Sequence, residues 1–285
     1  MFDNSSNSCF MFTLNCKGKL LVLDQPVVMG IINITPDSFY SGSRSRSIDD
    51  ILMRAEDMIN EGALILDIGG QSTRPNSRQV PADEELARVI PAIEAIHKQF
   101  PEQVLSVDTF YSNVAKEAIG AGAGIINDVS AGTMDEDMLP VAAELKVPYV
   151  IMHMLGKPQT MQQNPEYKNV TLDVFDFLHF KLAELVKMGI HDIIVDVGFG
   201  FGKTAAHNFQ LLRELSYFTQ LGKPVMVGLS RKATIYKTLG VVPDEALNGT
   251  TVLHTIALLN GANLLRVHDV KEAVQAVKLF MEYKK

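Results

Sequence analysis

The chain has 285 residues, 47% of them hydrophobic, and a formal net charge of −7 at pH 7. This charge argues against nonspecific attraction to nucleic acid or to an anionic membrane surface. No apolar run approaches the roughly 20 residues of a membrane span, and the N-terminus lacks the pattern of a signal peptide. Only Cys9 and Cys16 are present, too few for a disulfide framework, which favours a reducing, cytoplasmic location.

Residues 1–26 are predicted to form an N-terminal extension that contains a β-hairpin. Two short apolar segments, FMFTLNC and KLLVL, flank Lys17 and Gly18. A two-residue connection with glycine between apolar strands is typical of a hairpin. We expect this hairpin to cover the N-terminal end of the domain that follows, as a structural element.

From Val27 onward, short apolar segments repeatedly lead to a polar or charged residue. The segments have little alternation, as expected of parallel strands that are buried on both faces. Their polar end points are Asn33, Asp67, Asp108, Asn127–Asp128, His153, Asp196, Arg231–Lys232 and Arg266, with His268 two residues further on. Helical periodicity between and after them predicts helices over 48–61, 83–100, 113–121, 137–145, 171–188 and 271–283.

Eight strands that alternate with helices predict an α/β protein, a (β/α)8 TIM barrel that forms one domain over residues 1–285. The polar end points would then lie together at the carboxyl end of the barrel, where such barrels carry their active sites. Two loops at this end, 35–47 and 71–82, are longer than an ordinary connection. Long loops on this face often act as lids.

Two carboxylates, Asp108 and Asp196, each close a hydrophobic strand. Burying a carboxylate is costly unless it meets a cation or several N–H donors. Together they suit a ligand with paired N–H donors, such as an amino-pyrimidinone edge, and Asn127 adds both donor and acceptor capacity. A structural salt bridge or a helix cap is the alternative for either carboxylate alone.

Basic residues gather at other strand ends, which suggests an anion such as phosphate or pyrophosphate. They are Arg74, Arg231, Lys232, Arg266 and His268. Each singly could instead pair with a neighbouring aspartate. Asn33, with Asp37 nearby, could carry Mg²⁺ that bridges this anion, or could hold the first loop through backbone hydrogen bonds.

The glycine-rich segment 198–204, GFGFGKT, is not a nucleotide motif. Val197 stands where a phosphate-binding P-loop needs glycine, and the spacing differs from the dinucleotide fingerprint. The glycines either let the turn approach a ligand or fit a tight connection. His153, between two methionines, is interpreted as a packed strand residue.

Eight strings in chain order resemble the dihydropteroate synthase family. They are GIINITPDSF, DIGGQSTRP, SVDTF, IINDVSAG, VIMHMLG, GFGFGK, GLSRK and RVHD. The resemblance runs from about Val27 to the last strand. It implies a transferase of folate biosynthesis, a sulfonamide target, that joins p-aminobenzoate to 6-hydroxymethyl-7,8-dihydropterin diphosphate, releasing pyrophosphate and 7,8-dihydropteroate.

The resemblance also implies roles for individual residues. Asp108, Asn127, Asp196 and Lys232 would hold the pterin, with Met152 packed on its ring. Thr73, Arg74, Arg266 and His268 would hold the diphosphate, and Asn33 would bind Mg²⁺. Phe39, Pro75 and Phe201 would enclose p-aminobenzoate. Asp108, Lys232, Arg266 and His268 are the implied catalytic residues.

This sequence departs from the family pattern at several loop positions. Gln71 stands where a glutamate is expected, Val197 where a proline is expected, and Ala233 where a serine is expected. Asn76 also replaces a glycine. These changes leave the implied reaction in place and bear on the p-aminobenzoate contacts.

Other functions and the assembly state remain open at this point. A pterin-binding methyltransferase-like barrel would not need Arg74, Arg266 and His268, and a catalytically inactive pterin-binding barrel would have lost loop or phosphate residues. An aldolase-type barrel would need a lysine inside a strand. A homodimer is expected, and the C-terminal stripe of Val274, Val277 and Phe280 could form its interface or could simply cover the barrel.

Overall fold

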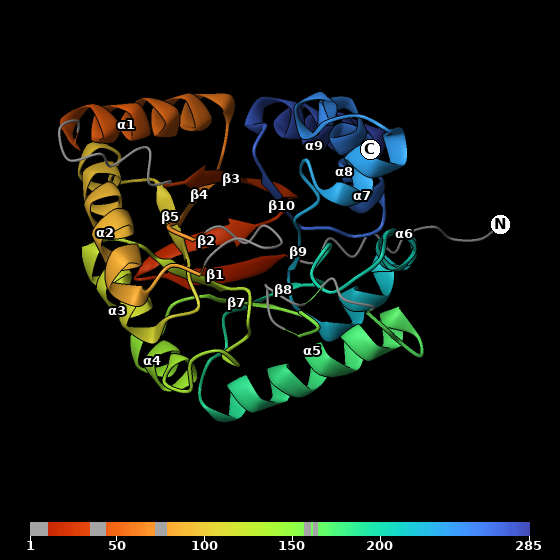
Figure 1. The fold of residues 1–285 in the computed structure, drawn as a ribbon, viewed down its shortest axis with the longest axis horizontal. Coiled ribbons are helices and arrows are strands. Elements are labelled where there is room, and N and C mark those ends of the chain that lie inside the picture. The colour runs from red at the N-terminus through yellow and green to blue at the C-terminus, as the bar shows by residue number, and fades with distance from the viewer. Residues whose placement is uncertain (1–10, 35–43, 72–78, 157–160, 162–164) are drawn as a thin grey trace.

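The computed structural model describes residues 11–34, 44–71, 79–156, 161 and 165–285. Eight parallel strands close into a barrel in the order β10-β3-β4-β5-β6-β7-β8-β9, with helices around it (Figure 1). The strands are β3 (Val27–Asn33), β4 (Ile65–Gly69), β5 (Val104–Asp108), β6 (Ile125–Asp128), β7 (Tyr149–Met152), β8 (Ile193–Asp196), β9 (Val225–Val227) and β10 (Leu264–Val267). The predicted (β/α)8 barrel is therefore confirmed.

An antiparallel hairpin precedes the barrel, as predicted. β1 (Phe12–Cys16) pairs with β2 (Lys19–Leu23), and the two turn residues, Lys17 and Gly18, both have positive φ. Such a turn matches the twist of the flanking strands. The buried face of the hairpin carries Leu14, Cys16, Leu21 and Leu23, which pack against the first inward-facing residues of the barrel strands. The hairpin thus covers the N-terminal mouth of the barrel.

The predicted helices are present, with ends that differ by a few residues. They are α1 (Arg44–Glu61), α2 (Ala82–Gln99), α3 (Ser112–Ala121), α4 (Met138–Leu145), α5 (Val170–Lys187) and α9 (Val270–Tyr283). Three helices without a sequence prediction also occur: α6 (Ala205–Arg213), α7 (Ala233–Leu239) and α8 (Leu247–Leu259). Of the C-terminal stripe, Val277 and Phe280 are buried against the barrel, so this stripe covers the core.

Two strands end elsewhere than the apolar pattern predicts. β4 continues two residues beyond Asp67, because Ile68 and Gly69 still pair with β5. β9 stops at Val227 although the apolar run continues to Leu229, because its pairing with both neighbours ends there. The chain then turns, and Arg231 takes a left-handed conformation with a φ of 53°. No helix among the described residues is long and apolar enough to cross a membrane.

Candidate active site at the carboxyl end of the barrel

The alternation of side chains along each strand builds the floor of the site. A lower layer inside the barrel is apolar and includes Ile65, Ile125, Val150, Ile194 and Leu264. Side chains two residues apart in a strand share a face. The next inward positions on these five strands are therefore Asp67, Asn127, Met152, Asp196 and Arg266. The sequence thus stacks a layer that is polar at four of these five positions on one apolar layer.

Arg266 lies between two carboxylates in this polar layer. Its Nε donates to Asp67 Oδ2 at 2.7 Å, and its Nη2 donates to Asp108 Oδ2 at 2.6 Å. Asn127 Nδ2 donates to the same oxygen of Asp67 at 3.0 Å. Arg266, which the resemblance assigns to the diphosphate, is thus directly linked to Asp108, which is assigned to the pterin. Asp108 therefore forms the structural salt bridge that was the alternative to ligand binding. It still lies at the mouth of the barrel.

Burial dominates the electrostatics of this cluster. It raises the pKa of Asp108 to about 7, an effect that Arg266 reduces and that Asp67 reinforces. Burial alone would lower the pKa of Arg266, but Asp67 and Asp108 outweigh it and raise this pKa. The guanidinium therefore stays charged, while one of the two carboxylates remains unneutralised and is available to a ligand with N–H donors.

Asp196 and Lys232 form a second charged pair. Asp196 Oδ1 accepts a hydrogen bond from Gly198 N at 2.7 Å, and Lys232 Nζ donates to Phe199 O. A Cβ at Gly228 would lie 3.8 Å from both Asp196 Oδ2 and Lys232 Nζ. Position 228 is the next inward position after Met226 of β9. Because glycine has no side chain, no side chain of position 228 lies next to these two charges.

The charges of this pair offset each other only in part. Burial raises the pKa of Asp196, and Lys232 opposes this rise. Burial lowers the pKa of Lys232 to about 8, and Asp196 opposes this fall. The ammonium also lies 4.5 Å from the centre of the Phe201 ring, a cation–π contact. Lys232 therefore connects the carboxylate predicted to hold the pterin with the ring predicted to enclose p-aminobenzoate.

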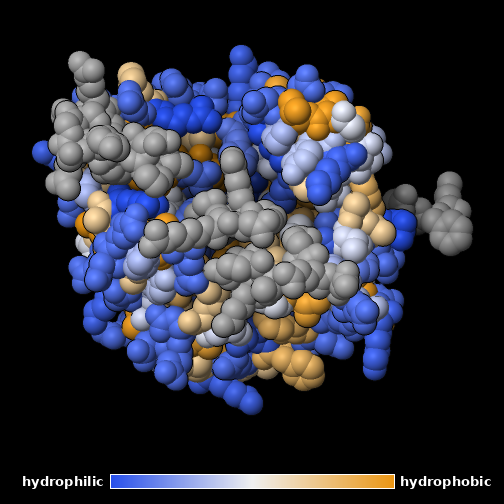
Figure 2. All heavy atoms as spheres, in the orientation of Figure 1, coloured by the Kyte–Doolittle hydropathy of each residue, from blue (hydrophilic) through white to orange (hydrophobic). Residues whose placement is uncertain are grey.

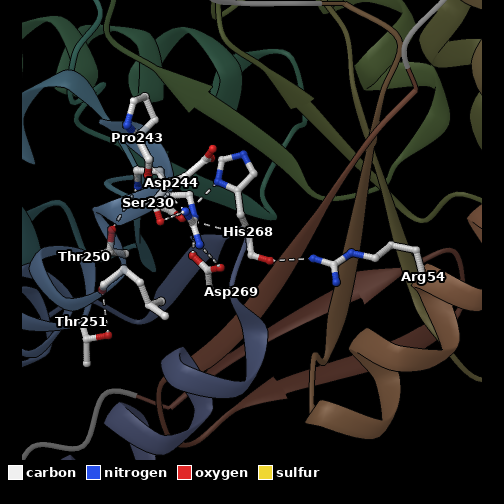
Figure 3. Close-up of polar contacts among 10 residues, drawn as sticks. Arg54, Ser230, Pro243, Asp244, Thr250, Thr251, His268 and Asp269 are labelled. Carbon is white, nitrogen blue, oxygen red and sulfur yellow. Dashed lines mark hydrogen bonds and ion pairs between the residues drawn. The ribbon is translucent and has the colours of Figure 1, made fainter. Parts of the chain in front are cut away.

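His268 is a neutral, oriented imidazole at the end of β10. Burial, followed by the charge of Arg266, lowers its pKa to about 4. Ser230 Oγ accepts a hydrogen bond from His268 N at 3.2 Å and lies 3.0 Å from His268 Nδ1 (Figure 3). Because Ser230 accepts at its oxygen, its own proton can go to Nδ1. This arrangement leaves the Nε2–H of His268 free to donate to an anion.

Arg231 forms an ion pair with Asp269 of the same chain, so its charge is already matched without a ligand. Its Nε and Nη2 donate to the two carboxylate oxygens of Asp269 at 2.9 and 2.8 Å. Its Nη1 donates to the carbonyls of Pro243 and Asp244 (Figure 3). The alternative of a pairing with a neighbouring aspartate is therefore correct for Arg231. The pair fixes the turn after β9 against the start of α9, next to His268.

The chemistry of Asn33 fits a magnesium ligand. Its side chain is exposed at the end of β3, and a Cβ at Gly69 would lie 3.7 Å from both Asn33 Oδ1 and Asp108 Oδ2. Among the described residues, no cluster of three histidine, cysteine or acidic side chains could hold a metal. Mg²⁺ is commonly held by one or two protein oxygens together with water and substrate phosphates. One exposed amide oxygen suits that pattern.

An apolar cluster lies on the same face. Its members are Phe110, Val129, Met152, Met161 and Phe201. Met152 and Phe201 were predicted from the sequence, whereas Phe110 and Val129 were not singled out, although both lie in strings that carry the resemblance. Thr73, Arg74, Phe39 and Pro75 lie outside the described residues.

Gln71, which stands where a glutamate is expected, links the start of the second long loop to its far end. Its Oε1 accepts from Val80 N at 2.9 Å, and its Nε2 donates to Val80 O and to Glu85 Oε2, each at 2.6 Å. Glu85 is fully buried, and its Oε1 has no hydrogen-bond partner among the described residues. The amide of Gln71 can donate to Glu85, which a carboxylate at this position could not do. Sequence reasoning missed Glu85, since it lies within an ordinary helical pattern.

Glu85 is expected to make stability depend on pH. Burial raises its pKa to about 7, with Thr109, Gln71 and Arg88 opposing the shift. Because this pKa is above its unfolded value, the free energy of unfolding falls as pH rises from about 4.5 through about 7. Glu85→Gln should flatten this part of the curve and stabilise the protein by up to about 3 kcal/mol at pH 8. Chemical denaturation at pH 5 and pH 8 measures the effect, and parallel curves for the two proteins would contradict it.

Comparison with known proteins gives the same family throughout. Residues 29–268 match the family described as pterin binding enzyme. The chain is 44% identical over 269 residues to a dihydropteroate synthase of Haemophilus influenzae, a match that covers 94% of this chain and 97% of the relative.

Solved structures agree with the sequence match. A dihydropteroate synthase of Xanthomonas albilineans with 4-aminobenzoic acid has a TM-score of 0.88 and 42% identity, covering 95% of this chain and 98% of the other. A dihydropteroate synthase of Yersinia pestis in a sulfonamide drug complex has a TM-score of 0.90 and 40% identity, covering 96% and 99%. The fold, the paired charges at the mouth of the barrel and these matches place the chain in the pterin-binding enzyme family.

Proposed function

We propose that this chain is a dihydropteroate synthase, which condenses 6-hydroxymethyl-7,8-dihydropterin diphosphate with p-aminobenzoate. The observation that carries the proposal is the pair of charged groups, buried Asp196 and half-buried Lys232, on either side of Gly228. A flat heterocycle with several N–H groups and one carbonyl is complementary to carboxylates, an amide and an ammonium in this position. The relatives named as dihydropteroate synthases support the assignment.

The pterin would lie on the polar floor of the barrel. Asp108 and Asp196 accept hydrogen bonds from its amino and ring N–H groups, and Asn127 supplies a further oxygen, since its Nδ2 is already bonded to Asp67. Lys232 donates to an acceptor atom of the ring. Met152, which is 3% exposed, packs on the ring face. Buried polar groups of this kind reject ligands that leave them unpaired.

The diphosphate would lie toward β10 and the second loop. Arg266 and the Nε2–H of His268 stabilise the negative charge that grows on the leaving oxygen, and Thr73 and Arg74 of the loop are proposed to bind the same group. Mg²⁺ held at Asn33 would supply charge neutralisation to the phosphate oxygens. His268 acts here as a neutral donor, because its pKa is lowered to about 4.

The bond that breaks joins the pterin methylene carbon to the diphosphate oxygen, which leaves with the electron pair. The electron-rich pterin ring, held between Asp108 and Asp196, stabilises the cationic carbon that remains. The amine nitrogen of p-aminobenzoate then forms the new C–N bond and loses one proton. Because an aryl amine is already neutral and nucleophilic at working pH, the reaction does not require a strong general base.

Phe201 would form one wall for p-aminobenzoate, together with the predicted contacts of Phe39 and Pro75. Its ring belongs to the apolar cluster next to Met152, so the aryl ring would lie close to the pterin. Sulfonamides, which resemble p-aminobenzoate, would compete for the same wall. The solved structures with 4-aminobenzoic acid and with a sulfonamide support binding of such aryl compounds by this chain.

The test of the function is pyrophosphate release by the purified protein with pterin diphosphate, Mg²⁺ and p-aminobenzoate. We expect steady release that requires all three additions. Release that continues without p-aminobenzoate would indicate hydrolysis, and release under no condition would favour an inactive pterin-binding protein. A methyltransferase-like activity is not supported, because Arg266 and His268 supply anion-binding groups that it would not need.

We further propose a homodimer in a reducing, cytoplasmic compartment. Cys16 is a free, buried thiol, in keeping with such a compartment. On α8, Val252, Ile256 and Leu259 are exposed, and Figure 2 shows an apolar patch in the region of α7 to α9. These three positions recur at helical spacing, so they form one face that a second copy could cover.

Ile256→Glu is expected to convert the dimer to a monomer, because a carboxylate in an apolar interface loses its hydration. Sedimentation equilibrium would measure this change. Leu172→Glu, on the exposed face of α5, is the matched control and should leave the mass unchanged. A wild-type protein that sediments as a monomer at micromolar concentration would contradict the proposed dimer.

A further inference from the structure

Lys203 is a buried lysine near the end of the loop from β8 to α6, and the proposed reaction does not use it. The residue is only 3% exposed. Its Nζ donates to the carbonyls of Gly198, Phe201 and His153 at 2.9, 3.1 and 3.1 Å, and lies 3.0 Å from His153 Nδ1. Burial lowers the pKa of Lys203 to about 7, and Asp196 opposes this fall. In its charged form the amine has three protons, so these four acceptors fully occupy it.

The imidazole in this cluster is neutral and acts as an acceptor. Burial, together with the charge of Lys203, lowers the pKa of His153 to about 3. Nδ1 therefore has a free lone pair that faces the ammonium. His153 also contacts the ring of Phe177 edge-on, with centroids 5.0 Å apart, so its own position is fixed by α5. Lys203 thus ties the loop to a firmly packed residue at the end of β7.

Residues 198–202, which precede Lys203, have a backbone conformation that needs this support. Gly198, Gly200 and Gly202 all have positive φ, between 63° and 82°. A Cβ at Gly198 would lie 1.9 Å from His153 O, and a Cβ at Gly202 would lie 2.7 Å from Leu155 O. The loop therefore packs directly against the backbone that follows β7. Three glycines also give it a large conformational entropy to lose on folding.

The carbonyls of this loop bind two different lysines. Gly198 O and Phe201 O accept from Lys203, whereas Phe199 O, between them in sequence, accepts from Lys232. The ring of Phe201 lies 4.5 Å from the Lys232 ammonium. The same five-residue turn therefore carries the aryl wall of the site and one of the acceptors that orient Lys232.

We propose that Lys203 is a positioning residue for p-aminobenzoate binding: it fixes the 198–202 turn so that the ring of Phe201 faces Lys232. This inference rests on the proposed function. Lys203 touches neither substrate. The turn also bonds Asp196 through Gly198 N and Lys232 through Phe199 O, but Asp108, Asn127 and Asp196 are carried by the strands themselves. The larger effect is therefore expected on the aryl acid.

Removal of the ammonium leaves the carbonyls of Phe201 and His153 and one imidazole nitrogen without this donor, and leaves Gly198 O with only the bond from Phe201 N at 3.1 Å. The turn is then expected to relax, which moves Phe201 away from its place against Lys232. For Lys203→Ala we expect the KM for p-aminobenzoate to rise by about tenfold or more, as for loss of roughly 1.4 kcal/mol of binding. The KM for pterin diphosphate should change by less than about threefold.

The test measures both KM values by pyrophosphate release, with and without added propylammonium. This cation replaces the missing part of the side chain, so it should restore the KM for p-aminobenzoate, whereas 1-propanol should not. Lys203→Met, which keeps most of the side-chain volume, is the second variant and should give the same selective rise without rescue. Thermal unfolding establishes that each variant is folded.

Lys17→Ala is the matched control. Its Nζ donates to Ile119 O at 2.7 Å, a similar lysine–carbonyl bond at the opposite end of the barrel. This variant should lose some stability and keep both KM values. The proposal is overturned if a folded Lys203 variant keeps the wild-type KM for p-aminobenzoate, or if both KM values rise together. An inactive wild-type protein would instead contradict the proposed function, so the two failures are distinguishable.

Discussion

Asp196→Asn is expected to lower kcat/KM for pterin diphosphate by about 10³-fold or more, because the amide places N–H groups where the ligand also has N–H groups. Asp196 is buried, and its Oδ1 already accepts from Gly198 N. The variant therefore keeps its local geometry and loses the carboxylate oxygen that lies beside Gly228. Titration calorimetry with 6-hydroxymethylpterin should show the corresponding loss of binding.

Asp192→Asn is the control for this substitution. Asp192 lies immediately before the same strand, at the opposite end of the barrel, where its Oδ2 accepts from Asn15 N at 2.9 Å. We expect this variant to keep near-normal kinetics. Lys232→Ala should resemble Asp196→Asn, since it leaves Asp196 buried without its cation. Near-normal turnover in Asp196→Asn or Lys232→Ala would contradict the assignment of this pair to the pterin.

Arg266→Met is expected to destabilise the protein by about 3–5 kcal/mol as well as to abolish turnover. The guanidinium bonds to two buried carboxylates, and breaking a buried ion pair by removing one partner leaves the other charge uncompensated. Urea denaturation followed by circular dichroism measures this loss. Asp67→Asn in the same chain should recover part of the stability, because it removes one of the two carboxylates.

The destabilisation of Arg266→Met should depend on pH. The pKa of Asp108 is already raised to about 7, and loss of Arg266 removes the cation that opposes this rise. A carboxyl with a raised folded pKa stabilises the protein at low pH and loses this contribution as pH rises through that pKa. The difference from wild type should therefore be larger at pH 8 than at pH 5. An equal loss at both values would contradict this account of the cluster.

The sequence predicted the barrel because its signals are local and repeated. Each strand is a short apolar run, each is followed by helical periodicity, and alternation along a strand places Asp67, Asn127 and Asp196 in one inward layer. The fold and the candidate site could therefore both be predicted from the sequence. The hairpin could be predicted for the same reason, since Lys17 and Gly18 mark a two-residue turn.

What the sequence did not predict depends on contacts between distant segments. Arg266 was assigned to an anion, yet its nearest partners are carboxylates on two other strands, and no local pattern reports that pairing. Lys203 stands in a glycine-rich segment that does not match the nucleotide motifs, and its partners include His153, 50 residues away. Glu85 looks like any residue of an amphipathic helix. Such groups become visible only when burial and partners are known.

The most direct test of the central claim is to identify the product by mass spectrometry. Wild-type protein is incubated with pterin diphosphate, Mg²⁺ and p-aminobenzoate labelled with ¹⁵N at the amine, and the reaction is compared with that of Asp196→Asn. We expect wild type to form 7,8-dihydropteroate that carries the label, with one pyrophosphate released per product, and the variant to form almost none. Pyrophosphate release without a labelled conjugate, or no product with all substrates present, would contradict the account.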